Sequence, residues 1–106
     1  MCHPRPPKIE GALLMRLVRN AVRSGQYAFK PHARQRCRER DLPVSFVESA
    51  LERGRHVPSR DRYEPRDGGW SYCIEGRSPN DDALRVIVAF QGWMMIVTVV
   101  RLGSED

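Results

Sequence analysis

The stretch ALRVIVAFQGWMMIVTVVRL, residues 83–102, decides the fold of this chain. It holds two runs rich in β-branched residues, 83–90 and 93–102, which the tight dipeptide Gln91–Gly92 joins. β-Branched side chains favour strands because they pack well on a pleated surface. Two such runs around a short turn are typical of a hairpin. Both faces of the second run are apolar, so we expect a central strand that helices cover on one side.

Two further strands are predicted before this hairpin. The segment WSYCIEG, 70–76, alternates, so that Trp70, Tyr72 and Ile74 share one face. The segment RHVPSRDRY, 55–63, reads as an edge strand, because a proline inside it cannot donate to the hydrogen-bond ladder of a central strand. Turns rich in Pro, Gly and Asp separate these segments.

The first half of the chain is predicted to be helical. Residues 10–26 carry apolar side chains at helical spacing and end near a glycine, which favours an amphipathic helix. A second helix is expected from Pro31 to about Arg40, and residues 27–29 could form a short extended piece before it. The segment SFVESALERG, 45–54, predicts a third helix, in which Ser45 and Glu48 have the spacing of a capping box.

The order of these elements predicts the fold class. Helices come first and strands follow, which favours an α+β domain over a parallel βαβ fold. We expect N-terminal helices packed on a C-terminal antiparallel sheet of about four strands. The 106 residues suit one domain, at 9–102, between a proline-rich flexible tail at 1–8 and a short tail at 103–106.

Composition narrows the class of partner. The net charge is +5, and of 18 basic residues 2 are lysine, which leaves 16 arginines. The arginine guanidinium is a flat, permanently charged fork that suits phosphate, so we expect a polyanion as partner: RNA, DNA or an acidic protein. The three cysteines lack zinc-site spacing, and we expect free thiols, no metal and no cofactor. No signal peptide or membrane span is apparent, so we expect a cytoplasmic protein.

The segment FKPHARQRCRERDLP, 29–43, is the most basic part of the chain, with arginine at every second position from Arg34 to Arg40. On a helix, residues four apart share one stripe, as His32, Arg36 and Arg40 would. The segment could be a solvated helix face, a nucleic-acid grip or the edge of an active site. We expect it to line the rim of a polyanion-binding groove, with His32 and Arg36 facing inward and several other arginines solvated.

Several of these residues resemble a known family. Its pattern is a glycine and phenylalanine lead-in, a His-Ala pair, Arg, Glu-Arg and a short helix ending in glycine. The matching residues are Gly25, Phe29, His32, Ala33, Arg36, Glu39, Arg40, Leu42 and Gly54. The segments YCIEGRSPNDDALRVIVAF and MIVTV are similar to the C-terminal half of the pattern. Over residues 14–100 the chain therefore resembles the domain-of-unknown-function family numbered 4258.

That family is similar in arrangement to the RelE-like toxins, and particularly to MqsR-like mRNA interferases. The resemblance implies a RelE-like α+β fold and a toxin of a type II toxin-antitoxin system. It also implies cleavage of mRNA, either free or on the ribosome, without metal or cofactor. The expected partners are RNA and a cognate antitoxin, which in such systems often carries a zinc-finger domain. The basic residue that ends the last strand in MqsR-like proteins corresponds to Arg101, displaced by about one position in the sequence.

RNA cleavage of this kind needs a base near the ribose 2′-hydroxyl, an acid at the departing 5′-oxygen and positive charge on the phosphorane. Histidine suits acid-base work near neutral pH, tyrosine can serve beside cations, and arginine keeps its proton and acts as a clamp. The catalytic candidates are His32, Arg36, Tyr63, Arg85 and Arg101. The RNA-binding candidates are Arg40, Arg60, Arg62 and Tyr72.

Other interpretations remain open. Each candidate could have a purely structural role, such as a packed tyrosine or a solvated arginine. Trp70 and Trp93 could stack on bases or pack in the core. The main alternative function is a non-catalytic basic module of the same fold that binds nucleic acid or an acidic protein. A helix-turn-helix is disfavoured because the strand-forming half is large, and a metal enzyme because no ligand spacing is present.

Overall fold

The computed structural model describes residues 7–67 and 69–103. Within them the helices are α1 (Gly11–Ser24), α2 (Pro31–Glu39) and α3 (Val44–Arg53). The strands are β1 (Tyr27–Phe29), β2 (Arg55–His56), β3 (Arg62–Glu64), β4 (Gly69–Arg77), β5 (Ala83–Gln91) and β6 (Trp93–Arg101). Two short 3-10 turns are η1 (Pro58–Arg60) and η2 (Pro65–Asp67). The expected α+β class, with helices first and strands last, is confirmed.

The sheet is larger than expected. It has six strands in the order β1-β6-β5-β4-β2, and β3 also pairs with β4. The expectation of about four strands was wrong for two reasons. The short extended piece expected at 27–29 joins the sheet as β1 and pairs in parallel with β6, so the sheet is not purely antiparallel. The predicted edge strand 55–63 is interrupted by η1 at Pro58 and becomes two short strands, β2 and β3.

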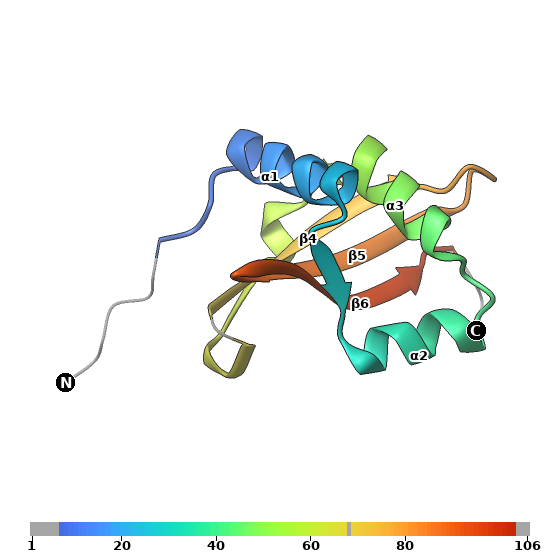
Figure 1. Cartoon of the computed structure of the whole chain (residues 1–106). Helices are drawn as coiled ribbons and strands as arrows, with labels where there is room; N and C mark the ends of the chain where they lie inside the picture. The colour runs from blue at the N-terminus through green and yellow to red at the C-terminus, as the bar shows by residue number, and fades with distance from the viewer. Residues whose placement is uncertain (1–6, 68, 104–106) are drawn as a thin grey trace.

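The helices lie in one main layer. Figure 1 shows α1 and α3 together on one face of the sheet, while α2 lies apart from them near β6. The core between the layers contains the buried side chains of α1, α3, β4, β5 and β6. Its largest fully buried members are Leu14, Leu51, Ile74, Leu84, Met94 and Ile96. We call the opposite side of the sheet the open face.

The helix boundaries follow from local sequence. The C-terminal residue after α1 is Gly25, whose φ of 75° is left-handed, and its N–H bonds back to the last turn. The first turn of α2 contains Pro31, as expected. The predicted capping box of α3 was wrong: the residue before the helix is Pro43, and no side chain caps it. The other end of α3 is held by Arg19, whose Nε donates to the carbonyl oxygen of Glu52 at 3.0 Å.

The contact between α3 and β4 is unusually close. A Cβ atom added to Gly76 would lie 2.1 Å from the carbonyl oxygen of Ala50, and one added to Gly54 would lie 2.3 Å from the same atom. These two glycines therefore let the helix backbone approach the strand. This approach fixes the layer of helices against the sheet.

The expected tails at 1–8 and 103–106 lie largely outside the described residues, which begin at Pro7 and end at Gly103. Lys8, the next residue, contacts the domain through Asp61. None of the helices in the described part of the chain has the length and apolarity that crossing a membrane requires.

Candidate nucleic-acid interface

Alternation along the strands places a set of arginines on the open face. Arg62 of β3 stands opposite Ser71 of β4, and Glu75 of β4 stands opposite Arg85 of β5. Directly opposed residues share a face of the sheet. The neighbours of Arg85 along its strand, Leu84 and Val86, are fully buried on the helix side, so Arg85 points the other way. We call Arg60, Arg62 and Arg85 the open-face arginines.

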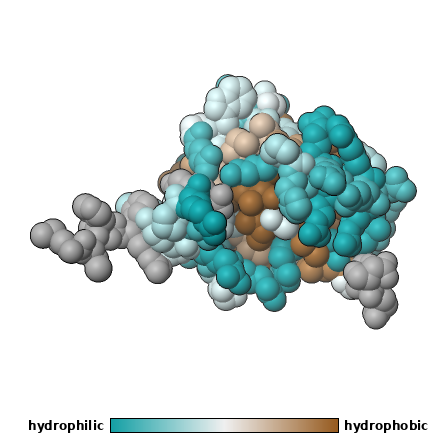
Figure 2. Space-filling model, turned by 90° about the horizontal axis from the view of Figure 1, so that it is seen from below, coloured by the Kyte–Doolittle hydropathy of each residue, from teal (hydrophilic) through white to brown (hydrophobic). Residues whose placement is uncertain are grey.

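Two hollows lie among these arginines. The larger hollow has a volume of about 460 Å³ and is lined by Ser59, Arg60, Asp61, Arg62, Arg85 and Ile87. The smaller hollow, of about 260 Å³, is lined by Arg60, Arg62, Glu64, Ser71, Ile87, Val97 and Thr98. The two share Arg60, Arg62 and Ile87 and so lie next to each other. Figure 2, which views the molecule from below Figure 1, shows hydrophobic surface enclosed by hydrophilic surface.

A β-bulge lies in the smaller hollow. The pairing of β5 with β6 shifts register between Ile87 and Val88, so that Val97 has no partner on β5. Bulges bend a strand and re-aim its side chains, and they occur often beside functional sites. Here the bulge places Val97 and Thr98 together in the floor of the hollow.

The charges on the open face are partly paired. Arg85 Nε donates to Glu75 Oε2 at 3.0 Å, and Arg60 Nε lies 4.0 Å from the same oxygen. The side chains of Arg85 and Glu75 are 23% and 21% exposed, so this pair is shielded from water more than a surface salt bridge is. Arg60, at 54%, remains open to solvent. Glu75 thus fixes Arg85 and leaves the charge of Arg60 largely available.

A buried carboxylate anchors the segment that carries Arg60 and Arg62. The side chain of Asp61 has no exposed area, and its Oδ2 lies 2.8 Å from Lys8 Nζ and 2.7 Å from His56 Nε2. Its Oδ1 accepts the backbone N–H of Cys73 at 3.0 Å. Each oxygen of this carboxylate therefore has a donor, as a buried charge requires. The hydrogen bond from Cys73 therefore ties residues 60–62 to β4. Arg60 and Arg62, on either side of Asp61, line the larger hollow.

The structure brings together three of the nine predicted site residues, the open-face arginines. Tyr63 stands opposite Trp70 on the other side of the sheet, with ring centroids 5.6 Å apart. Tyr72 is only 3% exposed, and its Oη accepts the backbone N–H of Ile9. A residue buried in this way is not available to RNA.

The other predicted residues lie elsewhere. Arg101 stands opposite the buried Leu84, so it belongs to the helix side of the sheet. Its Nε is buried and has no hydrogen-bond partner among the described residues. His32, Arg36 and Arg40 are exposed on or just after α2. No residue of α2 lines either hollow, so the expected convergence of this helix with the sheet on one groove is not found in the described part of the molecule.

Sequence reasoning missed three acidic residues: Asp61, Glu64 and Glu75. Glu75 was recognisable in principle. It follows Ile74, which faces the core, so alternation along the strand places Glu75 and Cys73 on the other face of the sheet. Asp61 gave no such signal. Its burial depends on a 3-10 turn, η1, that brings residues 56 and 61 together.

The cysteines are not part of the site chemistry. Cys37 and Cys73 are free thiols, as expected, while Cys2 lies outside the described residues. Burial raises the pKa of both thiols, which keeps them protonated and unreactive near neutral pH. Within residues 7–67 and 69–103, no three His, Cys, Asp or Glu side chains gather closely enough to hold a metal ion.

Comparison with known proteins identifies one family. Its model, described as a domain of unknown function (DUF4258), matches residues 29–101, from the end of β1 to the end of β6. The resemblance to this family expected from the sequence is confirmed. No curated protein and no solved structure matches the chain significantly.

Proposed function

The chain belongs to the DUF4258 family, and from the geometry of its open face we propose that it is a metal-independent endoribonuclease of toxin type, which binds and cleaves single-stranded mRNA there. The observation that carries this proposal is the gathering of Arg60, Arg62 and Arg85 around two adjacent hollows. Phosphates of a single strand are the ligands that suit several guanidinium groups in a shallow site. The apolar floor gives bases or riboses a surface to contact.

The chemistry proceeds by attack of the ribose 2′-oxygen on the adjacent phosphorus, which breaks the bond to the 5′-oxygen and leaves a 2′,3′-cyclic phosphate. Glu64 lines the smaller hollow beside Arg60 and Arg62, and its side chain is 41% exposed. It is placed to accept the proton of the 2′-hydroxyl, while the arginines stabilise the charge on the phosphorane. The departing 5′-oxygen takes its proton from water.

The test is cleavage of a defined single-stranded RNA in the presence of a chelator. We expect products with 2′,3′-cyclic phosphate ends and no cleavage when deoxyribose replaces ribose at the cut position. Glu64→Gln keeps RNA binding and loses about 100-fold or more in cleavage rate, because 100-fold is about the least that a positioned base contributes. Glu10→Gln, at an exposed glutamate that lines neither hollow, is the matched control. RNA that stays intact with the wild-type protein overturns the catalytic proposal.

A second candidate is RNA binding without cleavage. It is favoured by the absence of any histidine or tyrosine from the residues that line the two hollows, since histidine is the usual acid-base group near neutral pH. The same experiment separates the two candidates. A binding module shifts the RNA in a gel with a steep salt dependence and leaves its ends unchanged.

The proposed cellular role is that of the toxin of a type II toxin-antitoxin pair in the cytoplasm, with a RelE-like or MqsR-like relationship. An antitoxin, of the zinc-finger kind or another, would need acidic groups to cover the open-face arginines. Expression of the chain alone is then expected to arrest growth and degrade mRNA, and co-expression of the antitoxin to restore both. Normal growth with intact mRNA, at a protein level shown by immunoblot, contradicts this role.

A further inference from the structure

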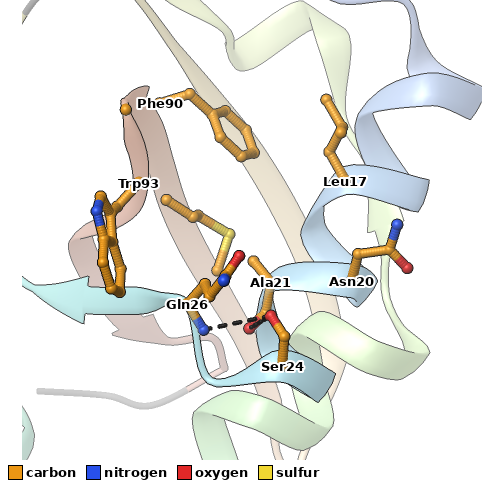
Figure 3. A pocket seen from close by; sticks show the side chains of 9 residues that line it. Leu17, Asn20, Ala21, Ser24, Gln26, Phe90 and Trp93 are labelled. Atoms are coloured by element: carbon orange, nitrogen blue, oxygen red, sulfur yellow. Dashed lines mark hydrogen bonds between the residues drawn. The ribbon is translucent and has the colours of Figure 1, made fainter.

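A third hollow lies on the helix side of the sheet, at the tip of the β5–β6 hairpin. Figure 3 shows it between the hairpin and the C-terminal end of α1, with Phe90, Leu17 and Trp93 around it. Its volume is about 350 Å³, and the rest of its lining is Asn20, Ala21, Ser24, Gln26, Gly92 and Met94. We call it the hairpin pocket.

The two tryptophans of the chain have opposite environments. Trp70 is partly buried and packs edge-on against Tyr63, with Lys8 Nζ 5.0 Å from its ring centroid. Trp93 is 57% exposed, the highest value among the large hydrophobic side chains that the structure describes as exposed. A tryptophan left in water at the mouth of a pocket forgoes the burial that would stabilise the fold. One exposed apolar side chain is common by itself, and it is the hollow beside Trp93 that marks a binding surface.

The polar side chains of the hairpin pocket are two amides and the hydroxyl of Ser24, which already donates to the carbonyl oxygen of Ala21. Asn20 on α1 and Gln26 in the turn both line it, and their side chains make no hydrogen bond to the residues that the structure describes. A side-chain amide offers both donors and an acceptor, so it can pair with the edge of a nucleobase. No arginine, lysine or acidic residue lines this pocket. Its chemistry therefore suits a flat, neutral, hydrogen-bonding ring and not a phosphate.

We propose that the hairpin pocket binds one unpaired base of the RNA strand whose phosphates lie on the open face. This inference rests on the RNA-binding part of the proposed function and adds a base-recognition subsite to it. Trp93 begins β6, and Val97 and Thr98 of the same strand line the smaller hollow. Four to five residues of strand span about 15 Å, so an extended RNA chain that leaves the open face and turns over the tip of the β5–β6 hairpin reaches both places. Single-stranded RNA is recognised in this way, by stacking on aromatic rings and pairing with base edges.

The test uses the fluorescence of Trp93 and a single-stranded RNA oligonucleotide of mixed sequence. The RNA quenches the wild-type protein, and the quenching is largely lost in Trp93→Phe, which retains a ring for stacking. Trp93→Ala weakens RNA affinity by roughly 5- to 150-fold, the range for the loss of one base stack. Leu13→Ala, at an exposed leucine of α1 that does not line the pocket, is the matched control and leaves affinity unchanged. The thermal midpoints of all variants are compared to exclude unfolding.

The outcomes separate this inference from the function on which it rests. If the wild-type protein binds RNA and Trp93→Ala binds it equally well, the base subsite is refuted while the proposed function stands. A strand in which every nucleotide lacks its base is expected to bind the wild type and Trp93→Ala with the same low affinity. Equal affinity of the wild type for the abasic and natural strands also refutes it. If the wild type does not bind RNA, both the base subsite and the proposed function fail.

Discussion

Glu75 and Arg85 stand directly opposite each other on β4 and β5, and Arg85 Nε donates to Glu75 Oε2 at 3.0 Å on the open face. The pair fixes one guanidinium at the edge of the larger hollow while it leaves a negative charge beside the proposed phosphate path. The glutamate therefore has two opposing effects. It positions Arg85, and it repels the ligand.

Glu75→Gln separates these effects. At low salt we expect RNA affinity to rise by about fivefold, because the lost repulsion is about 1 kcal/mol for unit charges 4 Å apart in water. The rate of cleavage is expected to fall, because Arg85 is then less firmly held. Filter binding and single-turnover cleavage measure the two quantities, with Glu10→Gln at the start of α1 as the control for net charge. Weaker RNA binding by Glu75→Gln at low salt contradicts this account.

Asp61→Ala is expected to be strongly destabilising. It leaves His56 and the N–H of Cys73 without the acceptor they share, and loss of one partner from a buried charged cluster costs about 3–5 kcal/mol. Urea unfolding measures the change. Glu39→Ala is the control, because that carboxylate is exposed and accepts a surface hydrogen bond from Gln35, so its loss should cost no more than about 1 kcal/mol. An Asp61→Ala protein as stable as the wild type would show that the buried carboxylate does not anchor the segment.

The free energy of unfolding is expected to fall at alkaline pH because of Tyr27. Burial, and then the hydrogen bond that its hydroxyl donates to Glu48, raise the pKa of Tyr27 above its ordinary value near 10. The native state therefore holds a proton that the unfolded state releases. The resulting stabilisation is complete below pH 10 and is lost as the pH rises above it. Tyr27→Phe should be less stable at pH 7 by about 1 kcal/mol, and the gap to the wild type should narrow by pH 11. A constant gap in urea unfolding would contradict this linkage.

Gly76→Ala tests the contact between α3 and β4. The added methyl group would collide with the carbonyl oxygen of Ala50, so we expect the free energy of unfolding to fall by about 3 kcal/mol or more. Gly25→Ala is the control, because nothing lies within 4 Å of the added carbon there and only the φ of 75° opposes it, at about 1 kcal/mol. Equal losses in the two variants would mean that the close approach is easily relieved.

The sequence predicted the longer elements because their periodicity is strong. The buried residues Val47, Ala50 and Leu51 of the third helix, and the long hairpin of β5 and β6, lie as expected. The pairing of the short strands was not predictable. The extended piece expected at 27–29 is β1, but its partner, like that of β2, lies far along the chain.

Strand periodicity also predicted part of the candidate site. Arg85 lies on the opposite face from Val86, as alternation along a strand requires. Arg60 lies in the η1 turn, so alternation does not explain why it meets Arg62. The position of α2 relative to the sheet depends on tertiary packing of Ala33 and Cys37, which the arginine pattern does not encode. For that reason His32 and Arg36 were grouped with the sheet arginines although they do not line the same hollows.

The most direct test of the central claim compares two triple variants with the same loss of charge. One replaces the three open-face arginines by glutamine, and the other replaces Arg34, Arg36 and Arg38 of α2. The measured quantity is the slope of the logarithm of RNA affinity against the logarithm of salt concentration, to which each phosphate contact adds about 0.7 for a single strand. The account predicts that the open-face variant loses about 2 units of slope together with cleavage, while the α2 variant keeps most of both. A slope that falls in the α2 variant and persists in the open-face variant would contradict it.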